Sequence, residues 1–201
     1  MKTVYFYGDS NTDGYDPRGM FGGRYPDDAC WTSIVQKKLS GSWLCTADGM
    51  NGREIPLRTS VAAELLAKRL ADFPDLTLFA VMLGTNDVLD MGVPDADRIC
   101  RRMEDFLSWL SGYFRAAGSA TRTAVVIPPP IKISEPGGST FTKAMEDLQE
   151  KYRHLAANEK ILCIDSCAWG LDLAFDGVHL SEEGHRQFAE GMVRALEDMT
   201  E

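Results

Sequence analysis

The sequence predicts an α/β fold in which helices cover both faces of a five-stranded parallel sheet. Short apolar runs rich in β-branched and aromatic residues alternate with longer stretches whose apolar residues recur at helical spacing. This alternation is typical of a parallel sheet, because helices then cover both of its faces. A chain of 201 residues, 44% of them hydrophobic, is long enough to bury one core of this kind. We therefore expect residues 1–201 to form a single domain with three layers, α/β/α.

Five apolar runs are the predicted strands. They are Thr3–Tyr7, Ser42–Thr46, Leu76–Leu83, Thr123–Ile127 and Lys160–Ile164. Prolines at positions 128 to 130 end the fourth run, because proline supplies no N–H group to a strand ladder. The predicted helices are Trp31–Leu39, Ser60–Asp72, Ala96–Ala117, Phe141–Ala157 and Ser181–Met199. Ser60 and Ser181 stand at N-cap positions, where a serine side chain accepts a hydrogen bond from the first helical turn.

The charge balance argues against a nucleic-acid partner. The net charge is −9, and the basic pairs Lys37-Lys38 and Arg101-Arg102 are flanked by apolar or acidic residues. A protein that binds a duplex needs clustered lysine and arginine to displace counterions. No apolar run approaches the roughly 18 residues of a membrane-spanning helix, so we also expect no membrane partner.

The cysteines favour a reducing compartment. Cys30, Cys45, Cys100, Cys163 and Cys167 are scattered and odd in number, which fits free thiols better than a disulfide framework. Their spacing does not match a zinc site, so we expect no metal. The residues after Met1 lead directly into the first predicted strand and lack the pattern of a leader peptide. We therefore expect a cytoplasmic protein.

Chemically distinctive residues follow four of the predicted strands. They are Gly8–Gly14 after the first strand, Asp48–Arg53 after the second, Gly84–Asp87 after the third, and Asp176 with His179 after the fifth. In open parallel sheets, ligands bind beyond the carboxyl ends of the strands, so these segments should meet in one cleft. Together they supply a serine, a histidine and a carboxylate. A serine nucleophile needs an imidazole to take its proton and a carboxylate to orient that imidazole.

Each segment alone has a simpler interpretation. Gly8-Asp9-Ser10 could be a strand-to-helix turn with a capping side chain, and Gly84–Asp87 could be a tight turn. Other candidates for the base and the carboxylate are His154, His185, Asp165 and Asp172. Both of these histidines fall inside predicted helices, where a structural role is expected, and only Asp176 lies three residues before His179. The joint occurrence of the segments carries the functional interpretation.

The set resembles the SGNH hydrolases, a branch of the GDSL esterase and lipase superfamily, in the order of its blocks from residue 8 to residue 179. The resemblance implies a flavodoxin-like three-layer fold and an esterase that needs no cofactor. It implies that Ser10 is the nucleophile, His179 the general base and Asp176 the orienting carboxylate. It also implies an oxyanion hole formed by the backbone N–H groups of Ser10 and Gly52 and by the side-chain amide of Asn86.

The sequence departs from the family pattern at two positions. Asn11 replaces the leucine of the Gly-Asp-Ser-Leu motif. The block Asp48–Arg53 resembles that of small bacterial arylesterases, but Glu54 stands where those proteins usually have threonine. We expect Arg53 to form a structural ion pair. We expect the carboxylate of Asp9 to anchor the turn through backbone N–H groups.

Substrate and assembly are less constrained by the sequence. The loops at Tyr15–Asp28, Asp90–Asp97 and Ile131–Thr142 should form the walls of the cleft, and their mixed composition favours a small, partly polar pocket. Short-chain acyl esters and acetylated sugars fit such a pocket, whereas aryl esters, thioesters and lysophospholipids remain open as substrates of the same apparatus. A homo-oligomer is also left open, with Trp43, Trp109 or Trp169 as interface or core residues.

Two non-catalytic interpretations also remain open. In a flavodoxin-like binding module, Ser10-Asn11-Thr12 would cradle a flavin phosphate. The carboxylates of Asp9 and Asp13 oppose this, because they would repel a phosphate. A scaffold without turnover is the other interpretation, and the intact set of catalytic positions argues against it.

Overall fold

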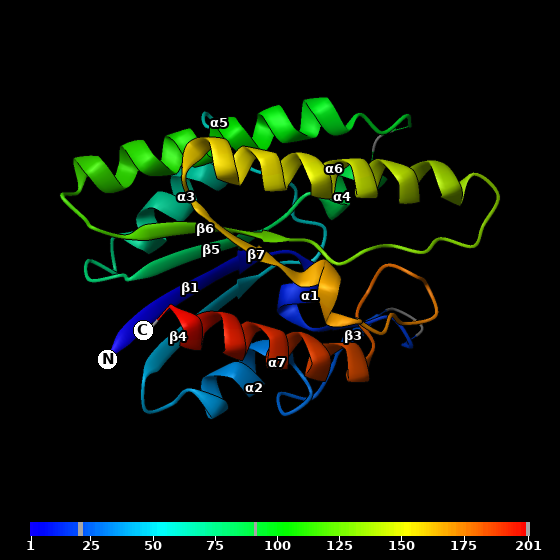
Figure 1. The fold of residues 1–201 in the computed structure, drawn as a ribbon, viewed down its shortest axis with the longest axis horizontal. Helices are drawn as coiled ribbons and strands as arrows, with labels where there is room; N and C mark the ends of the chain where they lie inside the picture. The colour runs from blue at the N-terminus through cyan, green and yellow to red at the C-terminus, as the bar shows by residue number, and fades with distance from the viewer. Residues whose placement is uncertain (20–21, 91, 200–201) are drawn as a thin grey trace.

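The computed structural model describes residues 1–19, 22–90 and 92–199, and it confirms the predicted α/β fold. A five-stranded parallel sheet has the strand order β4-β1-β5-β6-β7. The strands are β1 (Lys2–Gly8), β4 (Trp43–Gly49), β5 (Leu78–Met82), β6 (Arg122–Ile127) and β7 (Leu162–Asp165). The long helices form layers on both faces of this sheet (Figure 1).

One layer contains α3 (Val61–Leu70), α5 (Ala96–Ala116) and α6 (Gly138–Glu159), and the other contains α2 (Trp31–Lys38) and α7 (Glu182–Asp198). The two predicted serine caps are confirmed. Ser60 Oγ accepts the backbone N–H of Ala63, and Ser181 Oγ accepts that of Gly184. These two helices therefore begin where their capping residues indicated, whereas α6 begins at Gly138, three residues before the predicted Phe141–Ala157.

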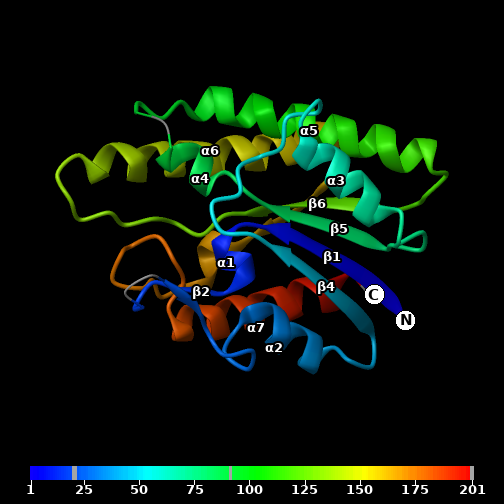
Figure 2. The same ribbon diagram turned by 180° about the vertical axis from the view of Figure 1, so that it is seen from behind.

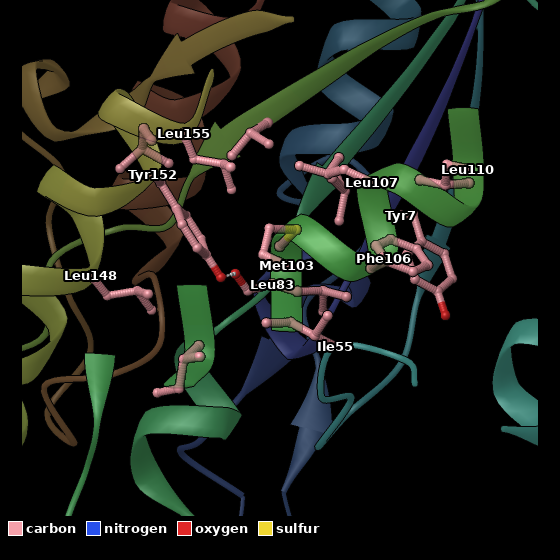
Figure 3. Close-up of a cluster of buried hydrophobic side chains, with 14 of the residues drawn as sticks. Tyr7, Ile55, Leu83, Met103, Phe106, Leu107, Leu110, Leu148, Tyr152 and Leu155 are labelled. Atoms are coloured by element: carbon pink, nitrogen blue, oxygen red, sulfur yellow. Dashed lines mark hydrogen bonds between the residues drawn. The ribbon is translucent and has the colours of Figure 1, made fainter. Parts of the chain in front are cut away.

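The central strand β5 separates two hydrophobic cores because its side chains alternate between the faces of the sheet. Phe79 and Val81 belong to the core under α5 and α6, whereas Leu78, Ala80 and Met82 belong to the core over α2 and α7. Figure 3 shows part of the first core, where the Tyr152 hydroxyl donates a hydrogen bond to Leu83 O at 3.2 Å. All five residues of β5 are buried, as expected for a strand covered on both sides.

Several strand boundaries differ from the prediction. β4 continues to Gly49, so Asp48 lies inside the strand, and β5 covers only the middle of the predicted Leu76–Leu83. β7 begins two residues after Lys160, because Lys160 ends α6 in a left-handed conformation with φ 55°. At Lys160, the conformation of the helix cap therefore decides the boundary rather than hydrophobicity.

Short elements around the carboxyl edge of the sheet were not predicted. They are α1 (Ser10–Asp13), the antiparallel pair β2 (Tyr15–Asp16) and β3 (Gly23–Arg24), α4 (Thr85–Leu89) and a 3-10 helix at Ser166–Trp169. Elements of two to five residues carry no detectable hydrophobic period. Figure 2 shows α1 and β2 beyond the ends of β1 and β4. Of the three tryptophans considered as interface residues, Trp43 is buried, and Trp109 and Trp169 pack partly buried against the cores.

Candidate active site

Two glycines let α1 pack directly on the end of the sheet. Gly8 in β1 and Gly49 in β4 are register partners. A Cβ atom on Gly8 would lie 2.0 Å from Thr12 Oγ1, and one on Gly49 would lie 2.2 Å from the backbone nitrogen of Asp13. Any larger residue at either position would push the short helix away. The first motif therefore starts with glycine because the backbone approaches closely here, and Ser10 becomes the first residue of α1.

Asp9 caps this helix from a buried position. Its side chain is 2% exposed, and Oδ1 accepts the backbone N–H of Asn11 at 3.0 Å. Burial raises the pKa of Asp9 to about 7, although the hydrogen bond from Asn11 and the charge of Arg53 oppose that rise. The expected anchoring of the turn by Asp9 is confirmed by this hydrogen bond.

Ser10, His179 and Asp176 form a continuous hydrogen-bonded series. Ser10 Oγ lies 3.0 Å from His179 Nε2, and His179 Nδ1 lies 2.6 Å from Asp176 Oδ2. The other carboxylate oxygen of Asp176 accepts the backbone N–H groups of Val178 and His179, both at 3.0 Å. Burial alone would raise the pKa of Asp176, but these hydrogen bonds outweigh it and hold the pKa below its ordinary value. A carboxylate that remains ionised near neutral pH therefore faces the imidazole.

The loop that carries Asp176 and His179 is fixed to the segment after β6. The backbone N–H of Lys132 donates to Gly177 O at 2.7 Å. Gly177 has φ 68°, and a Cβ atom there would lie 1.9 Å from Lys132 O. Both the left-handed conformation and the close approach require glycine. The Asp-Gly turn thus holds Asp176 and His179, which are three residues apart, in one rigid loop.

The competing histidines and aspartates lie in other environments. Asp165 pairs with Arg153 at 2.7 Å, and Asp172 accepts the hydroxyl of Ser181. The side chain of His154 is 73% exposed on α6. His185 is buried in α7, where burial lowers its pKa to about 4, and its ring meets Tyr25 edge to face. Of the sequence candidates, Asp176 and His179 are the pair placed beside Ser10.

The segment around Gly52 is held against the end of β1. Gly52 has φ 71° in the turn that follows β4. Arg53 Nη1 donates to Gly8 O at 2.8 Å, and Nη2 contacts Asp48 Oδ1 at 2.6 Å. Asn86 Nδ2 donates to Arg53 O at 3.0 Å, which uses one of the two N–H groups of that amide. The expected ion pair of Arg53 is confirmed, with Asp48 as its partner.

A second ion pair network explains the unusual Glu54. Arg102 on α5 contacts Glu54 at 2.7 Å and Asp87 at 2.9 Å. Asp87 also accepts the backbone N–H of Ile55 at 3.1 Å. Burial raises the pKa of Asp87 to about 6, and the charge of Arg102 opposes this rise. Glu54 therefore links the Gly52 segment to α4 and α5, a role for which the sequence alone offered no partner.

Tyr15 contacts the histidine from the β2–β3 hairpin. The centroids of the Tyr15 and His179 rings are 4.6 Å apart, and the ring planes are inclined by 50°. Tyr15 lies in one of the loops that the sequence predicts to line the cleft, but no residue pattern indicates its contact with His179. Residues 20, 21 and 91 of the expected cleft loops lie outside the described residues.

The described residues, 1–19, 22–90 and 92–199, contain no group of three or more histidine, cysteine or acidic side chains placed to hold a metal ion. They also contain no helix long and apolar enough to cross a membrane.

Serine, histidine and carboxylate in hydrogen-bonded series at the carboxyl edge of a parallel sheet form an arrangement that serine hydrolases of α/β fold use. Residues 6–187 match the model of the GDSL-like lipase/acylhydrolase family, so the chain belongs to that family. It is a carboxylic ester hydrolase of the SGNH type. No curated protein matches the sequence significantly.

Solved structures of similar proteins cover nearly the whole chain. A putative arylesterase from Agrobacterium tumefaciens is 26% identical with a TM-score of 0.84, covering 98% of this chain and 99% of its own. A carbohydrate acetylesterase family member from Sinorhizobium meliloti is 28% identical with a TM-score of 0.79, covering 99% of each chain. The aryl esterase of M. smegmatis is 22% identical with a TM-score of 0.83, covering 98% of this chain and 99% of its own, and it supports the fold.

Proposed function

We propose that this protein is a serine esterase that hydrolyses short-chain acyl or acetyl esters through an acyl-enzyme on Ser10. The observation that carries the proposal is the series from Ser10 Oγ to His179 Nε2 at 3.0 Å and from His179 Nδ1 to Asp176 Oδ2 at 2.6 Å. A nucleophile, a base within hydrogen-bonding distance and a carboxylate behind the base are the groups that acyl transfer needs. This arrangement favours an enzyme over the flavin-binding module considered from the sequence.

In the acylation step, Ser10 Oγ attacks the carbonyl carbon of the ester, and its proton moves to His179 Nε2. Asp176 accepts a hydrogen bond from the Nδ1 proton of His179, so Nε2 is free to accept the proton of Ser10. The negative charge of Asp176 then stabilises the imidazolium. The bond between the carbonyl carbon and the alkoxy oxygen then breaks. The departing alcohol takes the proton from Nε2, and the acyl group remains on Ser10.

In the deacylation step, a water molecule gives a proton to His179 Nε2 and attacks the acyl carbon. The acid leaves, and Ser10 Oγ recovers its proton. Three donors stabilise the negative charge on the oxygen of each tetrahedral intermediate in this proposal. They are the backbone N–H groups of Ser10 and Gly52 and the side-chain amide of Asn86. The hydrogen bond from Asn86 to Arg53 O supports this assignment, because it orients the amide toward the Gly52 segment.

The test is hydrolysis of p-nitrophenyl esters from acetate to decanoate by the wild type and by Ser10→Ala and His179→Ala. We expect turnover of the short esters by the wild type and a loss of about a million-fold in kcat for either variant. His154→Ala is the matched control, because it removes an exposed imidazole on α6. Folded variants with wild-type turnover would refute the assigned roles. A preference for decanoate would instead favour a lysophospholipase or thioesterase.

A carbohydrate acetylesterase is the second candidate. The similarity to the Sinorhizobium meliloti acetylesterase family member, which is 28% identical over 99% of this chain, favours it. Release of acetate from acetylated xylo-oligosaccharides at a higher kcat/KM than from p-nitrophenyl acetate would support this substrate. A lower value on every acetylated sugar would leave simple esters as the preferred class.

A further inference from the structure

The residue after the nucleophile contacts the backbone on both sides of the histidine. Asn11 is 2% exposed. Its Oδ1 accepts the backbone N–H of Leu180 at 2.8 Å, and its Nδ2 donates to Val178 O at 3.4 Å. These two backbone groups belong to the residues that flank His179. One side chain thus holds the short segment that carries the base.

The backbone of Asn11 is itself fixed in the core. Trp31 Nε1 donates to Asn11 O at 2.8 Å, and the backbone N–H of Asn11 donates to Asp9 Oδ1 at 3.0 Å. The Trp31 ring packs against Phe6 and Phe188, with ring centroids 4.8 Å and 4.7 Å away. The side chain of Asn11 therefore extends from a position that cannot shift without disturbing α2 and β1.

We propose that Asn11 is a positioning residue, whose side-chain amide clamps residues 178 and 180 and thereby sets the contact between Ser10 and His179. The inference rests on the proposed roles of those two residues. The alignment of a nucleophile with its base is sensitive, since a displacement of about 1 Å costs about 100-fold in rate. A leucine at position 11, as in the motif that gives the superfamily its name, has a similar branched shape but no hydrogen-bonding group.

The structure also indicates how the clamp should fail. Asp176 binds the backbone N–H groups of Val178 and His179 as well as the imidazole, so carboxylate and base form one unit. Without the amide of Asn11, this unit would shift relative to Ser10 while staying intact. The rate of serine attack should then fall. In a plot of rate against pH, however, the pH at which the rate reaches half its maximum on the acid side, the acid-limb midpoint, should stay where it is in the wild type. A residue that acted on the imidazole through Asp176 would move that midpoint.

The chain provides a matched control at the opposite end of the sheet. Gln36 on α2 accepts the backbone N–H of Cys45 at 2.7 Å and donates to Trp43 O at 3.4 Å. Its amide thus clamps the two residues that flank Leu44 in β4, in the same manner as Asn11 clamps the residues around His179. Trp43 pairs with Lys2 at the start of β1, whereas the site lies beyond the end of that strand. Gln36→Leu removes the same kind of clamp away from the site.

The experiment measures the second-order rate constant for reaction of Ser10 with a p-nitrophenyl alkylphosphonate as a function of pH, together with thermal unfolding. Asn11→Leu and Asn11→Ala should each react about 100-fold more slowly than the wild type, with an unchanged acid-limb midpoint. Asn11→Asp keeps the acceptor for Leu180 but places a second acceptor against Val178 O, so it should also react more slowly than the wild type. Gln36→Leu should unfold at a lower temperature and react at the wild-type rate.

Three results would overturn the inference. They are a wild-type rate in a folded Asn11→Leu or Asn11→Ala variant, an equal loss of rate in Gln36→Leu, and a displaced acid limb in the Asn11 variants. If only one of Asn11→Leu and Asn11→Ala folds, its rate decides. A wild-type protein that does not react at Ser10 refutes the proposed function itself, whereas a reactive wild type with equally reactive Asn11 variants refutes only the clamp.

Discussion

Replacing Asp9 with asparagine should abolish a loss of stability that the wild type undergoes as the pH rises from 4 toward 8. Asp9 caps α1 from a site that is 2% exposed, beside the residue assigned as the nucleophile. Burial raises its pKa from the ordinary 3.8 to about 7, so the folded protein opposes ionisation of this carboxyl group. The asparagine side chain would keep an oxygen that accepts the N–H of Asn11 and would carry no charge at any pH.

The magnitude follows from the two pKa values. Between pH 3.8 and about 7, the folded state binds the proton of Asp9 and the unfolded state does not. The contribution of Asp9 to stability is therefore complete at low pH and is lost as the pH rises through the folded pKa. A rise from 3.8 to about 7 corresponds to about 4 kcal/mol, because one pKa unit is about 1.4 kcal/mol. The free energy of unfolding of Asp9→Asn, relative to the wild type, should thus increase by about 4 kcal/mol between pH 4 and pH 8.

Urea unfolding of both proteins at several pH values measures this difference. His185, whose pKa burial lowers to about 4, titrates with the opposite sign but does so in both proteins and cancels. Asp16→Asn is the control, since hydrogen bonds from Arg18 lower the pKa of Asp16 from its ordinary 3.8. The contribution of Asp16 to stability is lost only as the pH falls below that value, so the difference between Asp16→Asn and wild type should stay nearly constant from pH 4 to pH 8. A difference between Asp9→Asn and wild type that stays constant from pH 4 to pH 8 would refute the reasoning.

Three other variants test the surroundings of the site. Asn86→Ala should lower kcat by about 100- to 1000-fold if the amide binds the oxyanion, and steady-state kinetics on p-nitrophenyl acetate measures the loss. Tyr15→Leu removes a ring contact worth about 1 kcal/mol and should lower kcat about fivefold, whereas Tyr15→Phe keeps the ring over His179 and should lose less. Arg53→Met removes the hydrogen bonds of Arg53 to Gly8 O and Asp48, while Asp48 keeps its ion pair with Arg69. This change should cost about 2 kcal/mol in urea unfolding, so a loss below about 1 kcal/mol would contradict the structural role of Arg53.

The α/β fold could be predicted because its signals are long and repetitive. Each long helix carries an apolar stripe, and the central strands are buried on both faces. The caps at Ser60 and Ser181 have a short-range chemical signal and were also predicted. The β2–β3 hairpin and the helices α1 and α4 are too short for any period, and tertiary contacts at the sheet edge determine them. Gly8 and Gly49 illustrate this, because only the packed structure reveals that α1 lies on both of them.

The site was predictable to the extent that its residues are close in sequence or stand at strand ends. The three-residue spacing of Asp176 and His179 fits a local turn, in which the carboxylate also accepts two backbone N–H groups. The clamp by Asn11 and the contact of Tyr15 with His179 join segments more than 160 residues apart, and no local pattern encodes them. The partner of Glu54 was equally hidden, because Arg102 lies on a helix that reaches the site only after folding.

Buried polar residues at the carboxyl edge of the sheet explain why local sequence patterns predict only part of the site. Asp9, Asn11, Arg53 and Asp87 are each at most 5% exposed, and each costs free energy unless its hydrogen bonds are satisfied. Their partners are mostly backbone groups of the segments that carry the assigned catalytic residues. Burial raises the pKa of both acidic members, to about 7 for Asp9 and about 6 for Asp87. Ionising either carboxyl group in the folded protein therefore costs free energy, because water no longer solvates its charge. Such an edge fixes donors before substrate arrives, which is what stabilisation of an oxyanion requires. Stabilising substitutions should therefore be found at the two buried carboxyl groups, Asp9 and Asp87, more readily than in the two cores. They should lower activity where the hydrogen bonds they remove orient Ser10, His179 or Asn86.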